Sequence, residues 1–194
     1  IVGSRNVDDD GMNFAKVIAR KCANEGVAVI SGGAKGVDTI AQMAALSSGG
    51  TVISVLANSM GKVLKEKELR DAIIENKLLI VSPFNPDSTF KIYNAMDRNK
   101  YIYALSKGAV VVSSDYNKGG TWNGATENLK NGWVPLYVRN GSNVPQGNRE
   151  LIKKGAIPLD ENMVYDEERK LKDILTCNKQ EKPEQMSLFR FLEP

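Results

Sequence analysis

Three glycine-bearing loops, each placed directly after a short apolar run, carry residue types that bind phosphate. The first loop, residues 3–6, reads Gly-Ser-Arg-Asn, and its guanidinium can bind a phosphate bidentately. The second, residues 31–38, combines glycines that permit close backbone approach with Lys35 and with Asp38, a candidate helix cap. The third, residues 118–121, reads Lys-Gly-Gly-Thr and opens a predicted helix. Each alone is an ordinary turn, but three at one sheet edge predict an anion-binding cleft.

A fourth segment, residues 97–100, places basic side chains within a predicted aromatic helix. Cations interleaved with aromatic rings can bind single-stranded nucleic acid through phosphate contacts and base stacking. Aromatic residues at spacings of three, four and seven are, however, typical of a helix face that packs in a core. We therefore expect Arg98 and Lys100 to contact the ligand in preference to the aromatic residues of this stretch, which are Phe90, Tyr93, Tyr101 and Tyr103.

Several kinds of chemistry lack support in this sequence. No loop matches the Gly-x-Gly-x-x-Gly dinucleotide fingerprint or the Gly-x-x-x-x-Gly-Lys-Ser/Thr phosphate loop. The chain has no histidine, the commonest general base, and its two cysteines, Cys22 and Cys177, are too far apart in sequence to suggest a zinc site. We therefore predict a binding protein with no catalytic residue, no cofactor and no metal, rather than an enzyme.

Short, continuous apolar runs alternate with helical patterns along the chain. Such runs are typical of strands that are buried on both faces of a parallel sheet. The alternation predicts a Rossmann-like, doubly wound α/β fold, with a mainly parallel sheet and helices on both of its faces. The predicted strands are residues 1–2, 27–30, 51–56, 78–81, 109–113 and 134–138, and the predicted helices lie near 14–23, 41–46, 64–76, 90–106, 122–131 and 164–175.

The 194 residues divide unevenly in charge and pattern. Residues 1–159 carry a net charge of +6 and form the predicted core, whereas residues 160–194 carry −3. We expect a short, partly helical extension over 160–176 and a flexible tail over 177–194. No apolar run approaches the roughly 20 residues of a membrane span, and no signal peptide begins the chain, so we expect a soluble, cytoplasmic protein.

An ordered series of motifs between residues 2 and 156 resembles the DNA-processing protein A family, DprA, also called Smf. The order and spacing of the motifs carry this resemblance more than any one motif does. They are Val2-Gly3-Ser4-Arg5, then Ser31-Gly32 with Ala34 and Gly36-Val37-Asp38, then Gly49-Gly50 with residues 52–56, then Arg98-Asn99-Lys100 with Leu105-Ser106, then Gly120-Thr121 with Ala125, and finally Gly147-Asn148 with Gly155-Ala156.

This resemblance implies a single-stranded DNA-binding protein that acts in DNA processing and recombination. It also implies a RecA-type recombinase as a partner and a homodimer. The chain departs from the family at Gln42, where a histidine is usual, and at Asp97, Gly119, Trp122 and Gly124. The candidate phosphate- and nucleic-acid-binding residues are Gly3, Ser4, Arg5, Ser31, Gly32, Gly33, Lys35, Gly36, Asp38, Arg98, Asn99, Lys100, Gly119, Gly120 and Thr121.

An alternative function is that of a nucleotide-binding protein of the phosphoribohydrolase (LOG-like) or nucleotide-sensing type. Those proteins carry a Pro-Gly-Gly-x-Gly-Thr-x-x-Glu motif, which residues 119–121 and Glu127 resemble only in part. The proline and a glycine are missing, and the glutamate lies at a different spacing.

The tail contains a second motif, Gln185-Met186-Ser187-Leu188-Phe189, which resembles the pentapeptide that binds the bacterial sliding clamp. A glutamine and two apolar anchors on a polar tether can dock into a groove of a partner. The alternative is that the apolar residues of the tail pack back onto the core. The sliding clamp is therefore a further candidate partner.

Overall fold

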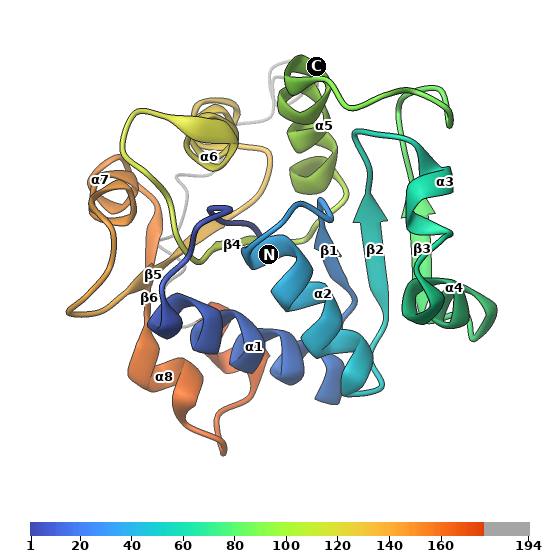
Figure 1. Ribbon diagram of the computed structural model, residues 1–194. Helices are drawn as coiled ribbons and strands as arrows, with labels where there is room; N and C mark the ends of the chain where they lie inside the picture. The colour runs from blue at the N-terminus through green and yellow to red at the C-terminus, as the bar shows by residue number, and fades with distance from the viewer. Residues whose placement is uncertain (177–194) are drawn as a thin grey trace, which may run out of the picture.

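The computed structural model describes residues 1–176, so the tail motif at 185–189 lies outside the described residues. Helices and strands alternate along the described chain (Figure 1). They are α1 (Asp9–Asn24), β1 (Val29–Ser31), α2 (Val37–Ser47), β2 (Val52–Val55), α3 (Met60–Val63), α4 (Lys67–Ile74), β3 (Leu78–Val81), α5 (Ile92–Ala104), β4 (Ala109–Val111), α6 (Gly119–Asn131), β5 (Leu136–Asn140), α7 (Gln146–Lys153), β6 (Ile157–Asp160), α8 (Glu161–Tyr165) and α9 (Leu171–Thr176).

The strands form two parallel three-stranded sheets, in the orders β1-β2-β3 and β4-β5-β6. The first residues of the chain lie between them. Val2 pairs in parallel with Val111 of β4, and the Ile1 nitrogen donates a hydrogen bond of 2.8 Å to the Ile30 carbonyl of β1. The two sheets are thus joined through residues 1–2, with β3 and β6 at the outer edges. The predicted Rossmann-like α/β fold is confirmed.

Helices cover both faces of this joined sheet. Figure 1 shows α1 and α2 side by side in front of the strands, and α4, α8 and α9 contribute to the same apolar cluster. The opposite cluster is built on α5, α6 and α7. Adjacent residues of β4 alternate between the two, since Val110 belongs to the first cluster and Val111 to the second. A doubly wound arrangement of this kind leaves a crevice at the carboxyl ends of its central strands.

The structure changes some of the predicted boundaries. Residues 1–2 form only an isolated bridge, and the helix predicted near 14–23 begins at Asp9 because Asp8 caps it, accepting a 2.7 Å hydrogen bond from the Gly11 nitrogen. The sequence prediction missed β6, α3 and α7. β6 was missed because Pro158 interrupts its apolar pattern, and α7 because its sequence is mostly polar.

The segment 160–176 forms α8 and α9, which pack on the α1 side of the molecule. Arg139 of β5 is fully buried there, with its Nε 3.1 Å from a Glu161 oxygen and its Nη1 3.4 Å from an Asp8 oxygen. The Tyr137 hydroxyl donates a hydrogen bond to the Leu175 carbonyl. Among the described helices, none combines the length and the apolar character that crossing a membrane requires.

Candidate nucleic-acid interface

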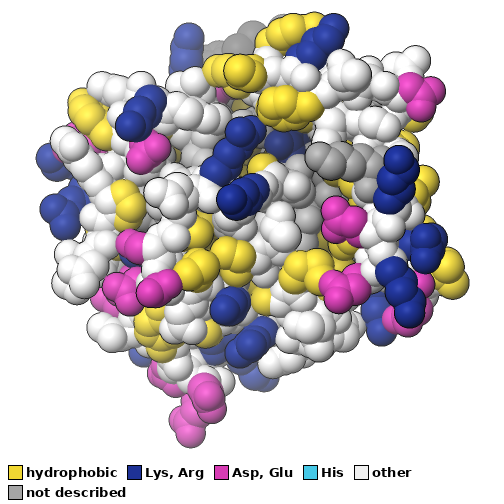
Figure 2. Space-filling model, in the orientation of Figure 1, with side chains coloured by type: hydrophobic (Ala, Val, Ile, Leu, Met, Phe, Trp, Pro, Cys, Tyr) yellow, Lys and Arg dark blue, Asp and Glu magenta, His cyan; other side chains and the backbone are white. Residues whose placement is uncertain are grey.

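A cleft of about 570 Å³ lies at the carboxyl ends of the central strands, where the predicted phosphate-binding loops meet. Its walls come from loop 3–6, from Ala34 and Asp38 after β1, from α5, and from residues 115–123 at the start of α6. Figure 2 shows Lys and Arg side chains gathered over the region between α5, α6 and α2. The structure therefore brings together segments that lie more than a hundred positions apart in the sequence.

Contacts with backbone atoms hold loop 3–6 in place, and they do not involve the Arg5 guanidinium. The Ser4 nitrogen and hydroxyl both donate to the Ser113 carbonyl, at 2.8 and 3.2 Å, so this hydroxyl stabilises the loop. Gly3 permits α2 to approach, because a Cβ there would lie 2.5 Å from the Val37 side chain. Arg5 is exposed at the rim of the cleft, with its guanidinium 5.6 Å from the centre of the Phe90 ring.

The second loop is mostly structural. The buried Ser31 hydroxyl donates to the Ile1 carbonyl at 2.7 Å, which uses its hydrogen in the sheet. Gly36 adopts a φ of 91° and is the N-cap of α2, so the prediction that Asp38 caps this helix is wrong. A Cβ at Gly36 would lie 2.5 Å from the Ser4 and Arg5 carbonyl oxygens, which shows how closely the first two loops pack. Gly33 is exposed but does not line the cleft.

Arg98 and Asp38 are both buried behind these loops, near enough for the charge of Arg98 to act on Asp38. Arg98 is only 4% exposed, and its Nη1 donates a hydrogen bond to the Val55 carbonyl. Asp38 accepts a 3.1 Å hydrogen bond from the Gly32 nitrogen. Burial raises the pKa of Asp38, and the positive charge of Arg98 opposes that shift. Arg98 joins α5 to β2 through its hydrogen bond to Val55, which makes Arg98 a positioning residue at the wall of the cleft. Asp38 joins α2 to the loop after β1 through Gly32.

Gly32 is required by this arrangement. A Cβ on Gly32 would lie 1.8 Å from Nη1 of Arg98, a separation that two atoms cannot adopt without movement. Within the described residues, the Nε of Arg98 and the Nε2 of Gln42 are buried with no hydrogen-bond partner. Some of the buried polar atoms behind the cleft therefore lack a hydrogen-bond partner.

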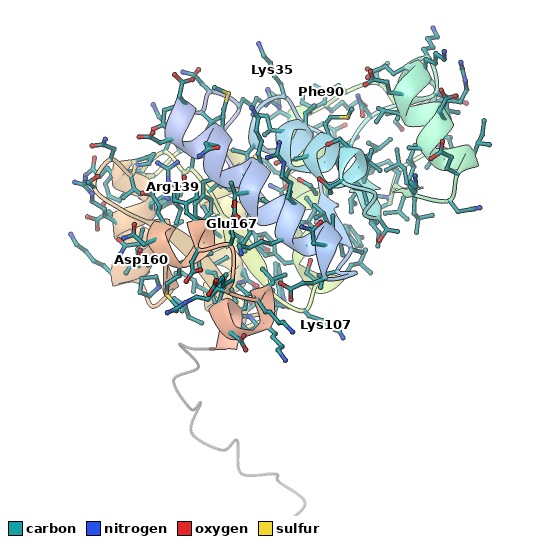
Figure 3. The ribbon with its side chains drawn as sticks, turned by 90° about the horizontal axis from the view of Figure 1, so that it is seen from below. Lys35, Phe90, Lys107, Arg139, Asp160 and Glu167 are labelled. Carbon is teal, nitrogen blue, oxygen red and sulfur yellow. The ribbon has the colours of Figure 1, made fainter. Side chains whose placement is uncertain are left out.

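The two predicted lysines lie outside the cleft lining. Figure 3 shows Lys35 projecting away from the ribbon, and this side chain is exposed. Lys100 pairs with Asp97 on the surface of α5, and its Nζ lies 5.3 Å from the centre of the Tyr101 ring. Either lysine can contact a strand only where the strand passes beyond the cleft. Their roles as phosphate ligands stay predictions.

The third loop places a free helix terminus in the cleft. α6 begins at Gly119, and no side chain of residues 1–176 caps it, so the N–H groups of Gly120 and Thr121 are available to an anion. Gly119 adopts a φ of 85°, a conformation that favours glycine. The Asn99 amide donates a 3.1 Å hydrogen bond to the Gly120 carbonyl and so fixes α5 against α6.

Sequence reasoning missed the apolar wall of the cleft. Phe90, Ile92 and Met96 line it, and they are 48%, 73% and 42% exposed. Tyr93 is exposed as well, whereas Tyr103 is buried. The aromatic spacing suggested a core face, but helix α5 begins only at Ile92, so Phe90 lies in the preceding loop. The cations beside these rings had indicated a nucleic-acid surface, but the aromatic spacing, typical of a core face, was given more weight.

Polar residues that were not among the candidate binding residues complete the lining. Lys118 adds a second exposed cation, at the N-cap of α6, and Asn6 and Asn123 add amide groups. Glu127, which the hydrolase alternative requires, is exposed on α6 and is absent from the residues that line the cleft. Among the described residues, no group of three or more acidic or cysteine side chains is placed to hold a metal ion.

Comparison with known proteins identifies a family and several relatives that this chain resembles. The sequence model of the DNA recombination-mediator protein A family matches residues 1–168. Protein Smf of Escherichia coli is 32% identical over 83% of this chain and 44% of its own length. The DNA processing protein DprA of Streptococcus pneumoniae is 30% identical over 80% of this chain and 56% of its own length. The chain thus spans about half the length of these curated relatives.

Solved structures give the same result for the fold. The X-ray structure of DprA from S. pneumoniae superposes with a TM-score of 0.68 at 26% identity, covering 81% of this chain and 56% of the relative. DNA processing protein A of Helicobacter pylori, in a structure that addresses its single-stranded DNA binding mode, superposes with a TM-score of 0.67 at 27% identity, covering 81% and 73%. A molybdenum cofactor carrier protein of Chlamydomonas reinhardtii, at 15% identity and a TM-score of 0.56, shares the fold alone.

Proposed function

This chain belongs to the DNA recombination-mediator protein A family, and on that premise we propose that it binds single-stranded DNA in the cleft and acts in DNA processing and recombination. The observation that carries the proposal is the composition of the cleft, where cations and free helix N–H groups face an exposed apolar wall. Cations and N–H groups bind phosphates, and an exposed apolar wall can pack against unpaired bases. The related structure from H. pylori supports the same ligand class.

One side of the cleft would bind the phosphates of the strand, and the other side would contact its bases. Arg5, Lys118 and the amino terminus of α6 would neutralise backbone phosphates. Phe90 and the neighbouring apolar side chains would pack against base faces, which are exposed in a single strand and stacked in a duplex. Arg98 would hold α5 against β2, and so fix the relative position of the two sides, without touching the DNA. Sequence preference should be slight, because stacking accepts any base.

The first experiment compares single and double strands. We expect fluorescence polarisation with labelled oligothymidine to show tighter binding than with a duplex of equal length, and we expect the affinity to fall steeply with salt. The slope of log K against log salt concentration should be about −0.7 for each phosphate contact to a single strand. No binding to oligothymidine at low salt would contradict the proposal.

Arg5→Ala tests the phosphate side of the cleft. The substitution removes one exposed cation, so we expect the salt slope to become shallower by about 0.7 and the affinity to fall about fivefold at roughly 0.1 M salt. Lys67→Ala is the matched control, since it removes an exposed cation from α4, away from the cleft. Equal losses in the two variants would show that net charge alone, rather than the cleft, determines binding.

Three further partners belong to this proposal. A second copy of the chain and a RecA-type recombinase are expected from the family, and the sliding clamp is expected from the motif at 185–189. The clamp is the most directly testable of the three. Its motif supplies a glutamine and two apolar anchors, Leu188 and Phe189, on a polar approach.

A peptide of residues 180–194 provides the clamp test. We expect it to bind the bacterial sliding clamp in a calorimetric titration, and we expect Leu188→Ala together with Phe189→Ala to abolish that binding, because the anchors supply the buried apolar area. Glu193→Ala is the control outside the motif. Equal binding by the doubly substituted peptide would refute the clamp assignment.

A further inference from the structure

A second groove lies between α2 and α4, on the face of the sheet that α1 also covers. Figure 1 shows these two helices on either side of β2. The floor of this α2–α4 groove is apolar and only partly covered, and its volume is about 730 Å³. The floor residues are Ile40, Met43, Ala44 and Leu46 of α2 and Ala72 of α4.

The two rims of the groove carry opposite charges. Lys16 and Arg20 of α1 form a basic rim, and Glu68, Asp71 and Glu75 of α4 form an acidic rim. Among residues 1–176, no ion pair joins one rim to the other, and Glu75 pairs only with Lys77 beside it. Lys16 and Arg20 on one rim and Glu68 and Asp71 on the other therefore remain available to a ligand that carries both signs.

We propose that the apolar C-terminal segment of this same chain, residues 186–192, docks in the α2–α4 groove. The segment reads Met-Ser-Leu-Phe-Arg-Phe-Leu, so its apolar side chains match the groove floor. Arg190 would face the acidic rim, and the flanking Glu184 and Glu193 would face the basic rim. This arrangement would complement the charges of both rims.

The tether has the reach that this docking needs. α9 lies on the same face as the groove, and its Leu175 carbonyl accepts a hydrogen bond from Tyr137 near the amino end of β5. From β5 to β2 the sheet spans four strand spacings, or about 19 Å. Residues 177–185 can extend to about 30 Å. A tether of this length gives an effective concentration in the millimolar range, so a weak contact is sufficient.

The docked segment would lie away from the DNA cleft. The groove extends along α2 from Thr39 to Ser47, and among the described residues it shares no lining residue with the cleft, which lies at the carboxyl ends of the strands. Docking would therefore leave DNA binding unchanged and would occlude Leu188 and Phe189 from any other partner. The groove would act as an intramolecular competitor for the clamp motif.

A spin-label experiment on the full chain tests the proposal. The chain would carry Cys177→Ser and Ser187→Cys, with a nitroxide attached at position 187. Cys22 should stay unlabelled, because it is buried and its burial raises the pKa of the thiol to about 11. We expect the amide signals of Ile40, Ala44 and Ala72 to lose at least about half of their intensity while those of Gly120 and Asn123 stay unchanged.

Charge exchange supplies the control. Glu68→Lys with Asp71→Lys should restore the lost signals, and a further Arg190→Glu should weaken them again. Asp9→Lys with Asp10→Lys is the matched reversal outside the groove and should have no effect. The proposal is refuted if the loss of signal is uniform, lies on another face, or appears only between differently labelled copies of the chain. It is refuted equally if adding Arg190→Glu to Glu68→Lys and Asp71→Lys does not bring the loss of signal back.

Discussion

Arg98→Ala should lower the free energy of unfolding by about 3–5 kcal/mol at neutral pH, because it removes the nearby positive charge that offsets the burial of the Asp38 carboxyl group. The same substitution removes the hydrogen bond to Val55 and opens a void beneath Gly32. DNA affinity should fall as well, since the loop at Gly32 and helix α5 lose their common support.

The cost of this substitution should depend on pH. Burial already raises the pKa of Asp38 in the folded protein, and loss of Arg98 raises it further. A carboxyl group with a raised folded-state pKa binds protons more tightly when folded, so stability falls as pH rises above the unfolded value of about 4. The deficit of Arg98→Ala should therefore be largest at neutral pH and should shrink as the pH approaches 4.

Urea unfolding of wild type and variant at pH 4.5 and pH 7.5 measures this effect. Lys100→Ala is the control on the same helix, and it removes a half-exposed pair worth at most about 1 kcal/mol. If the variant loses the same free energy of unfolding at both pH values, Asp38 does not contribute to the loss, and lost packing alone explains it.

Phe90→Ala should weaken oligothymidine binding by about 5- to 150-fold, which corresponds to the roughly 1–3 kcal/mol of one base stacked on an aromatic ring. The ring is half exposed and lines the cleft next to Arg5, so it offers one face to a base. The salt slope should change less than in Arg5→Ala, because no charge is removed.

Polarisation titration at two salt concentrations measures the loss. Phe90→Tyr keeps the aromatic face and should retain most of the affinity, whereas Leu79→Ala removes an exposed apolar side chain from β3, remote from the cleft, and should have no effect. If Phe90→Ala and Leu79→Ala bind alike, the apolar wall takes no part in binding and phosphate contacts alone explain it.

The strand-helix alternation was readable from the sequence because the central strands are apolar on both faces. β2, predicted at residues 51–56 and observed at Val52–Val55, is one of them. The outer strand β3 was predicted at its observed bounds because all four of its residues are apolar. The edge strand β6 was not predicted, because half-buried Ile157 and exposed Pro158 leave it without a continuous apolar run. Edge strands satisfy only one side of the hydrogen-bond ladder, so their sequences are less constrained.

The site was predictable in its location but not in its division of roles. Glycines and cations marked the loops, since backbone geometry restricts those residue types locally. Whether Arg98 faces solvent or is buried against Val55 depends on how α5 packs against β2, a long-range contact that no local pattern reports. The same limit applies to Phe90, whose exposure follows from where α5 begins.

The bridge between Val2 and Val111 also has a kinetic consequence. The β1-β2-β3 and β4-β5-β6 sheets each consist of neighbours in sequence, whereas the contacts of residues 1–4 with β4 and its following loop close a separation of about 109 positions. Loop closure over such a distance is slow compared with local pairing. We expect the two half-sheets to form first and to be joined last, which means that the DNA cleft would appear only in the final step of folding.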